Sequence, residues 1–133
     1  MDIANKLFSV ALKTRQNAYA PYSHFQVGAA VYCDDLQIYA GCNVENISFP
    51  CGICAESTAI GTMISHGAKK IMEILIVADS KQLITPCGAC LQRIAEFSDS
   101  QTIIHLANLK GIQKSLPLKE LLPYGFAASE LKK

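Results

Sequence analysis

The stretch IMEILIVAD (residues 71–79) is a nearly continuous run of apolar residues, interrupted by Glu73. A short run of this kind is typical of a strand that is covered on both faces of its sheet. A helical pattern follows over residues 87–97, and a second strand pattern, TIIHLAN, occupies residues 102–108. The order strand, helix, strand predicts a crossover between two parallel strands.

The residues before this unit predict a helix, a β-hairpin and a second helix. Apolar residues recur at helical spacing over residues 3–17, and Asp2 is placed to cap that helix. FQVGAAVYC (25–33) and QIYAGCNV (37–44) predict the two strands of the hairpin. Residues 54–66 predict the second helix.

These elements together predict an α/β fold with a mixed sheet and helices on both of its faces. A short helical turn is expected in PLKELLP (117–123). At 133 residues the chain is long enough for one domain with its own core, so we expect a single domain over residues 1–133.

Composition excludes several classes of partner. The formal net charge is +1, so no basic surface is indicated for nucleic acid. No apolar run reaches the roughly 18 residues of a membrane span. The start of the chain, MDIANKLFSV, lacks the separate basic and apolar regions of a secretory signal, so we expect a cytoplasmic protein with reduced cysteines. Half of the residues are apolar, more than a core of this size can cover, which predicts a homo-oligomer.

Two C-x-x-C pairs, CGIC (51–54) and CGAC (87–90), carry the strongest chemical signal. Cys54, Cys87 and Cys90 each fall at the start of a predicted helix, where free N–H groups and the helix dipole favour thiolates. Three thiolates with an open fourth position would hold a catalytic Zn²⁺, which lowers the pKa of water to roughly 7. Glu56 could then move a proton between that water and a substrate nitrogen. A metal ligand, x, Glu and a later P-C-x-x-C form the pattern of zinc deaminases.

The same spacing has two other interpretations. A closed structural zinc site would also use Cys51, and a C-x-x-C pair could instead be redox-active. Spacing alone supports the open and the closed zinc site equally well. Glu56 and the proline before Cys51 favour the open site. Cys33 and Cys42 fit small apolar positions in the hairpin, and the three histidines fit ordinary loop, helix-end and strand positions.

Five motifs then occur together and in order: YAPYSHFQVGAA (19–30), GCNVENISFP (41–50), CAES (54–57), PCGAC (86–90) and LLPYGF (121–126). In that combination the chain resembles the small homotetrameric cytidine deaminases, over about residues 5–126. The resemblance implies a three-layer α/β/α sandwich, one Zn²⁺ per subunit and a small-molecule nucleoside substrate. The implied reaction, part of pyrimidine salvage, hydrolyses cytidine and 2′-deoxycytidine to the uridines and ammonia. Water would attack C4 of the base, and Glu56 would first protonate N3 and later the leaving amine.

The resemblance also implies the roles of individual residues around the base. Cys54, Cys87 and Cys90 match the family's zinc ligands, and Glu56 matches its proton shuttle. The backbone around Ala55 matches the group that holds the base edge.

Further positions match the contacts that the family makes with the ribose and with neighbouring subunits. Asn43 and Glu45 match the pair that hydrogen-bonds ribose hydroxyls, and Phe25 matches an aromatic that packs on the pyrimidine ring. The remaining matches are to residues that reach a neighbouring subunit's site, so that the active site is complete only in the oligomer; these are Ile47, Phe49 and Phe126.

The chain departs from the family pattern at two charged positions. The family usually has arginine where this chain has Ser57 and Leu91, and those arginines are thought to hydrogen-bond the thiolates. Three thiolates on Zn²⁺ give a net charge of −1, so we expect a more electron-rich zinc and turnover shifted towards higher pH. Arg93 lies on a different helix face from Leu91, so it is not expected to substitute directly. A milder departure is Phe49, where the family often has tyrosine.

Two other functions remain open from the sequence. A non-catalytic oligomeric zinc module would explain the missing arginines, but the intact Glu56, Asn43 and Glu45 count against it. A deaminase of another cytosine-containing substrate is the other possibility. The neutral charge argues against a polynucleotide, and the Asn43–Glu45 pair argues for free ribose hydroxyls.

Overall fold

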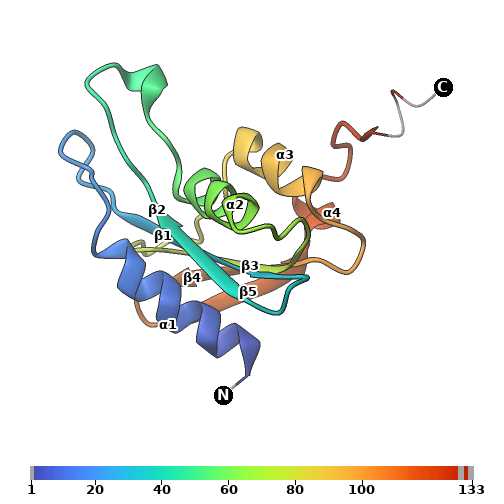
Figure 1. Cartoon of the computed structure of the whole chain (residues 1–133). Helices are drawn as coiled ribbons and strands as arrows, with labels where there is room; N and C mark the ends of the chain where they lie inside the picture. The colour runs from blue at the N-terminus through green and yellow to red at the C-terminus, as the bar shows by residue number, and fades with distance from the viewer. Residues whose placement is uncertain (1, 129–130, 132–133) are drawn as a thin grey trace.

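The computed structural model describes residues 2–128 and 131 and has one mixed sheet between two layers of helices (Figure 1). The helices are α1 (Ile3–Arg15), α2 (Ala55–Ser65), α3 (Gly88–Glu96) and α4 (Leu118–Leu121), with a 3-10 turn η1 (Phe49–Cys51). The strands are β1 (Val27–Cys33), β2 (Ile38–Cys42), β3 (Ile71–Ala78), β4 (Ile103–Asn108) and β5 (Gly111–Pro117).

The five strands lie in the order β2-β1-β3-β4-β5. β3 and β4 are parallel and are joined through α3, whereas β1 is antiparallel to both β2 and β3. The predicted hairpin and the predicted crossover are therefore both confirmed, and so is the mixed sheet.

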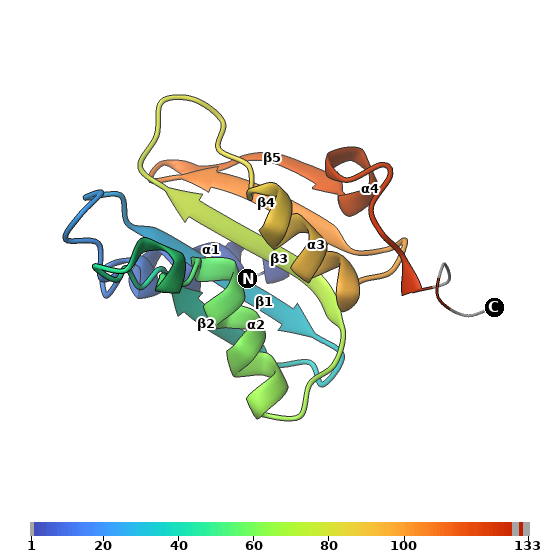
Figure 2. The same cartoon turned by 90° about the horizontal axis from the view of Figure 1, so that it is seen from above.

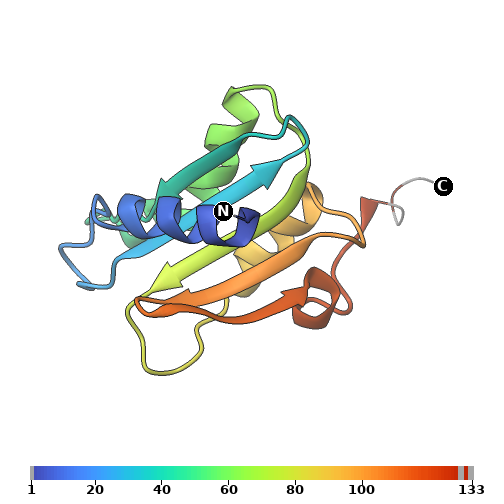
Figure 3. The same ribbon diagram turned by 90° about the horizontal axis from the view of Figure 1, so that it is seen from below.

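Helices cover both faces of the sheet, as the apolar character of β3 predicts. Figure 2 shows α2 and α3 on one face, and Figure 3 shows α1 crossing the other. Alternate residues of β3 serve the two layers: Ile74 and Ile76 belong to the core beneath α2 and α3, and Leu75 and Val77 belong to the core beneath α1. The three-layer α/β/α sandwich is thus confirmed.

Two glycines allow the helices to approach the sheet closely. A Cβ on Gly28 would lie 2.2 Å from the carbonyl oxygen of Ala11 in α1, and one on Gly41 would lie 2.4 Å from the backbone nitrogen of Ala59 in α2. Neither helix could keep its present position against a side chain at these points. α2 is therefore held at a fixed depth over β2.

One strand is missing from the sequence-based prediction. β5 pairs antiparallel with β4 at the edge of the sheet, from Gly111 to Pro117. Its central side chains are exposed, so it lacks the alternation of apolar and polar residues that predicts a half-buried strand. The short helical turn that follows is present as α4, and Asp2 caps α1 through a hydrogen bond of 2.8 Å from the Asn5 N–H. Within the described residues, no helix is long and apolar enough to span a bilayer.

Candidate active site

The N-terminus of α2 carries the first part of the site. Cys54 is the N-cap residue, and Ala55 and Glu56 form the first turn. A cap residue has extended backbone angles and lies at the end where the helix N–H groups are free. The Cys54 side chain therefore lies at the positive end of the α2 dipole.

The N-terminus of α3 carries the second part. Cys87 is its N-cap residue and Cys90 lies in its first turn. The Sγ atoms of Cys54, Cys87 and Cys90 all lie within 4.8 Å of one another. Two helices that start on either side of β3 thus bring together three thiols from distant parts of the chain. The fourth cysteine of the two pairs, Cys51, is exposed in η1 and lies outside this group, and its thiol is 3.5 Å from the Ser48 hydroxyl.

The three thiols differ in their environment. The backbone N–H groups of Cys90 and Ala89 lie on the side of the Cys87 thiol that favours its charged form, so the pKa of Cys87 is lowered. Burial raises the pKa of Cys54 and of Cys90, and nearby thiols and Glu56 add to the effect on Cys90. A cluster of three sulfurs, of which only that of Cys90 is buried, is a donor set suited to a soft divalent cation, which binds thiolates and releases their protons.

Glu56 is a buried carboxylate next to these thiols. Its side chain is 6% exposed, and burial raises its pKa above the ordinary value for glutamate. Its own backbone N–H and the charge of Arg93 act in the opposite direction. A carboxyl group whose pKa is raised by burial holds a proton more readily, which suits it to carry one to or from a bound molecule.

A cavity of about 200 Å³ opens over Glu56 and the two N-cap cysteines. Phe25, Asn43 and Ala55 also line it, so six of the residues singled out in the sequence meet here. Five further lining residues carry no signal in the sequence except the proline of the P-C-x-x-C motif; they are Val27, Ile76, Ile84, Thr85 and Pro86.

Asn43 fixes the position of the aromatic residue in this cavity. Its Oδ1 accepts a hydrogen bond of 2.8 Å from the Val27 N–H, and its Nδ2 donates one of 2.8 Å to the Phe25 carbonyl. One N–H of the amide is left after these two bonds. Asn43 is therefore more than a turn former: it holds the backbone on either side of Gln26, directly after Phe25, and keeps a donor for a ligand.

Glu45 lies in a second cavity of about 390 Å³, together with Tyr22, Ser23 and Phe49. Its Oε1 accepts from the N–H groups of Tyr22 (3.0 Å) and Ser23 (3.1 Å), and its Oε2 accepts from the Ser23 hydroxyl. The bond from the Ser23 hydroxyl is the main reason why the pKa of Glu45 is lowered. Glu45 is thus held as a carboxylate.

Three of the predicted residues lie away from the thiols within one chain. Ile47 is 76% exposed and Phe49 is 74% exposed, both on the loop between β2 and α2, which projects from the body of the molecule (Figure 1). Phe126 is 63% exposed, and the tail that carries it projects from the opposite side (Figures 1 and 2). Large apolar side chains on two projecting segments are a typical feature of surfaces that meet another protein molecule.

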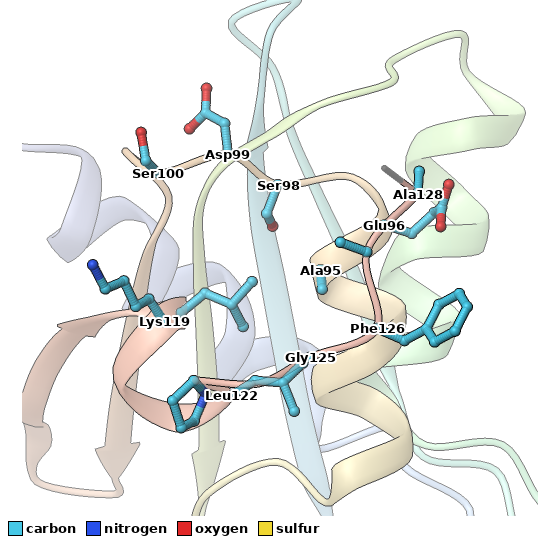
Figure 4. A pocket seen from close by; sticks show the side chains of 13 residues that line it. Ala95, Glu96, Ser98, Asp99, Ser100, Lys119, Leu122, Gly125, Phe126 and Ala128 are labelled. Atoms are coloured by element: carbon cyan, nitrogen blue, oxygen red, sulfur yellow. The ribbon is translucent and has the colours of Figure 1, made fainter. Parts of the chain in front are cut away.

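The tail is attached to the helix that carries Cys87 and Cys90. The Gln92 amide donates to the Phe126 carbonyl at 2.8 Å and accepts from the Phe126 N–H at 3.2 Å. Figure 4 shows the Phe126 ring beside α3, pointing away from Leu122 and Lys119. The cavity in this view has a volume of about 490 Å³ and lies between α3, α4 and the tail, but no thiol lines it.

Arg93 was not expected to substitute for the absent arginines, because it lies on a different helix face from Leu91. Its Nη1 nevertheless lies 3.7 Å from the Cys90 sulfur in hydrogen-bonding geometry. Leu91 is buried and Arg93, two residues later, is exposed, so these two side chains do face different sides of α3. The spacing that matters is from Cys90, since residues three apart on a helix are neighbours.

Comparison with known proteins agrees with this arrangement. Residues 1–106 match the family model described as the cytidine and deoxycytidylate deaminase zinc-binding region. A cytidine deaminase of Sporosarcina psychrophila is 41% identical over 131 residues, which cover 98% of this chain and 96% of the relative. A cytidine deaminase of Halalkalibacterium halodurans is 41% identical over 125 residues, which cover 94% of this chain and 95% of the relative.

Solved structures give the same result. The crystal structure of a cytidine deaminase from Burkholderia pseudomallei superposes with a TM-score of 0.88 at 36% identity, covering 95% of this chain and all of the other. The crystal structure of a cytidine deaminase from Mycobacterium tuberculosis superposes with a TM-score of 0.81 at 32% identity. The match covers 96% of this chain and 99% of the other. The chain therefore belongs to the cytidine and deoxycytidylate deaminase family.

Proposed function

We propose that this chain is a zinc-dependent deaminase that hydrolyses cytidine and 2′-deoxycytidine to the uridines and ammonia, as a step of pyrimidine salvage. The observation that carries the proposal is that Cys54, Cys87 and Glu56 line one cavity together with Phe25 and Asn43. Relatives named cytidine deaminase support it across nearly the full chain.

One Zn²⁺ per chain would be held by Cys54, Cys87 and Cys90. A set of three sulfur ligands leaves one of the four positions of a tetrahedral ion open, as catalytic sites require. When bound, the ion supplies a Lewis acid that lowers the pKa of a coordinated water to about 7.

Glu56 is the proton carrier in this proposal. Burial raises its pKa, so it can take a proton in the cavity and deliver it first to N3 of the base and then to the leaving amine. The Phe25 ring would pack on the base, and the backbone at Ala55 would hold the base edge. The spare N–H of Asn43 and the carboxylate of Glu45 would bind the ribose hydroxyls, one as donor and one as acceptor.

The proposal includes an assembly. Residues 1–133 form one catalytic domain of a homo-oligomer, with a tetramer as the expected form, in the cytoplasm. Ile47, Phe49 and Phe126 would each contribute to a neighbouring chain's site. Their exposure on segments that project from opposite sides of the subunit supports this role. No nucleic acid or membrane partner is included.

The experiment is ammonia release from cytidine and from deoxycytidine by the zinc-loaded protein, with zinc measured per chain. Glu56→Ala is expected to retain zinc and to lose at least about 100-fold in kcat, the usual contribution of general acid–base catalysis. Zinc without turnover on either nucleoside would contradict the proposal and favour a non-catalytic module or a different substrate.

Cys51→Ala tests the open site. Because the Cys51 thiol lies outside the group of three, this variant is expected to keep one zinc per chain and wild-type turnover. Loss of zinc from it would mean that the site is closed by four cysteines. Cys54→Ala is the matched variant that should lose the metal.

A further inference from the structure

Arg93 is the one guanidinium near the three thiols. The chain has only two arginines, and the other, Arg15, donates from its Nε to the Gln26 carbonyl at 3.0 Å. Arg93 reaches Cys90 from the next turn of the same helix, with an Nη1–Sγ distance of 3.7 Å. The Cys90 side chain is fully buried whereas Arg93 is exposed, so the guanidinium reaches a buried sulfur from the protein surface.

The charge of Arg93 is available to the site. Within the described part of the chain, no carboxylate oxygen lies within 4.0 Å of its nitrogens. Its positive charge lowers the pKa of both Glu56 and Cys54, against the direction in which burial acts on each.

A positive charge at this position would offset the negative charge of a three-thiolate metal site. Three thiolates around a divalent cation leave a net charge of −1, which is costly to bury. Leu91 is an apolar core residue and cannot offset that charge. The Ser57 hydroxyl is uncharged, and it is buried without a hydrogen-bond partner among the described residues.

We propose that Arg93 is a positioning residue of the metal site: it donates a charge-assisted hydrogen bond to the Cys90 thiolate and so stabilises the three-thiolate ligand set. This inference rests on the proposed zinc function. It replaces the expectation of an uncompensated, electron-rich zinc, because one guanidinium at the third position after Cys90 supplies the missing charge.

The test is the zinc dissociation constant, measured by competition with a chromophoric chelator. Arg93→Ala is expected to bind zinc about 10- to 100-fold more weakly, the usual effect of losing a partner of a metal ligand. Arg93→Lys should recover part of the affinity, because it keeps the charge and loses the planar donor group. Lys114→Ala, which removes a positive charge from exposed strand β5, is the matched control and should bind zinc as the wild type does.

Two further variants sharpen the test. Arg93→Gln keeps the length of the side chain and a donor but loses the charge, so it also should bind zinc more weakly and can be used if Arg93→Ala does not fold. Ser57 and Arg93 line the same cavity of about 440 Å³ between α2 and α3, so a guanidinium placed at position 57 has room to act in place of the one at 93. Ser57→Arg in the Arg93→Ala background is therefore expected to restore zinc affinity.

A spectroscopic measurement separates this role from a general loss of stability. In the Co²⁺-substituted protein, the thiolate-to-cobalt charge-transfer band should shift in Arg93→Ala, because the Cys90 sulfur loses its hydrogen bond. An unchanged band, with zinc affinity within twofold of wild type, would overturn the inference and leave the proposed function intact. A wild-type chain that binds no zinc would overturn both.

Discussion

The Ser23 hydroxyl donates a hydrogen bond to Glu45 and favours its charged form. It is the largest influence that lowers the pKa of this half-buried carboxylate, and the N–H groups of Tyr22 and Ser23 add to it. The hydroxyl donates to Oε2 while the two N–H groups donate to Oε1, so both oxygens are occupied. A ribose hydroxyl that binds Glu45 would meet an acceptor already fixed in direction.

Ser23→Ala is expected to raise the pKa of Glu45. Because the folded-state pKa is lowered in the wild type, the carboxylate persists to lower pH there, and in the variant protonation begins at higher pH. KM for cytidine should therefore rise towards acid pH more steeply than in the wild type, with kcat less affected. The measurements are a carboxyl-carbon NMR titration of Glu45 and KM against pH. Ser23→Thr, which keeps a hydroxyl, is the control. If the titration midpoint of Glu45 is the same in Ser23→Ala as in the wild type, the prediction is contradicted.

Several residues singled out in the sequence line one cavity in the structure, among them Cys54, Cys87 and Glu56. The two C-x-x-C pairs and the family motifs drew attention to them, since spacing alone did not separate an open site from a closed one. The role of Asn43 as a clamp on the Phe25 backbone could not be predicted, because its two partners lie 16 and 18 positions earlier. The contact from Arg93 was within reach of sequence reasoning, since Cys90 and Arg93 are three apart on a predicted helix.

Among the elements, α2 depends on the absence of a side chain at Gly41. A methyl group there would lie 2.4 Å from the Ala59 nitrogen and 2.7 Å from the Thr58 carbonyl carbon. Gly41→Ala should therefore push α2 from the sheet and cost about 1–3 kcal/mol of unfolding free energy, as overpacking does. It should also weaken zinc binding, because Cys54 caps this helix.

Gly61 in the same helix is the matched position. A Cβ there meets nothing within 4 Å, so Gly61→Ala is expected to stabilise the fold by about 0.5–1 kcal/mol through helix propensity. Urea unfolding of both variants measures the difference. Equal midpoints for the two variants would show that the contact at Gly41 is not tight.

The elements that were predicted correctly have strong internal patterns. β3 is apolar on both faces because α1 lies on one side and α2 and α3 on the other. β5 was missed because an edge strand with exposed Gln113, Lys114 and Ser115 has no apolar face to reveal it. Its existence depends on pairing with β4, which is a property of the folded sheet and not of the local sequence.

In the whole molecule, a shared active site has a direct consequence for mixed assemblies. If Phe126 serves a neighbouring chain, Glu56→Ala and Phe126→Ala chains damage different halves of each site. Mixed in equal amounts and reassembled, they should form intact sites at about one quarter of positions by random association. Deamination by the mixture should then exceed that of either variant alone.

The control mixture combines Glu56→Ala with Glu56→Gln, which leaves no intact site. Activity of the first mixture that equals the mean of its components would mean that each chain completes its own site. Gln92 holds the Phe126 backbone against α3 within the single chain, so this attachment does not depend on a partner.

The placement of the three thiols also matters to the unfolded chain. Cys54 and Cys87 are 33 positions apart in the sequence, with α2 and β3 between them. An ion bound by both closes that segment into a loop, and loop closure removes conformational entropy that the open chain would otherwise keep. In a reducing compartment, where a disulfide would not persist, thiolates can still cross-link the chain in this way. The ion that the reaction needs would then also stabilise the folded chain against unfolding.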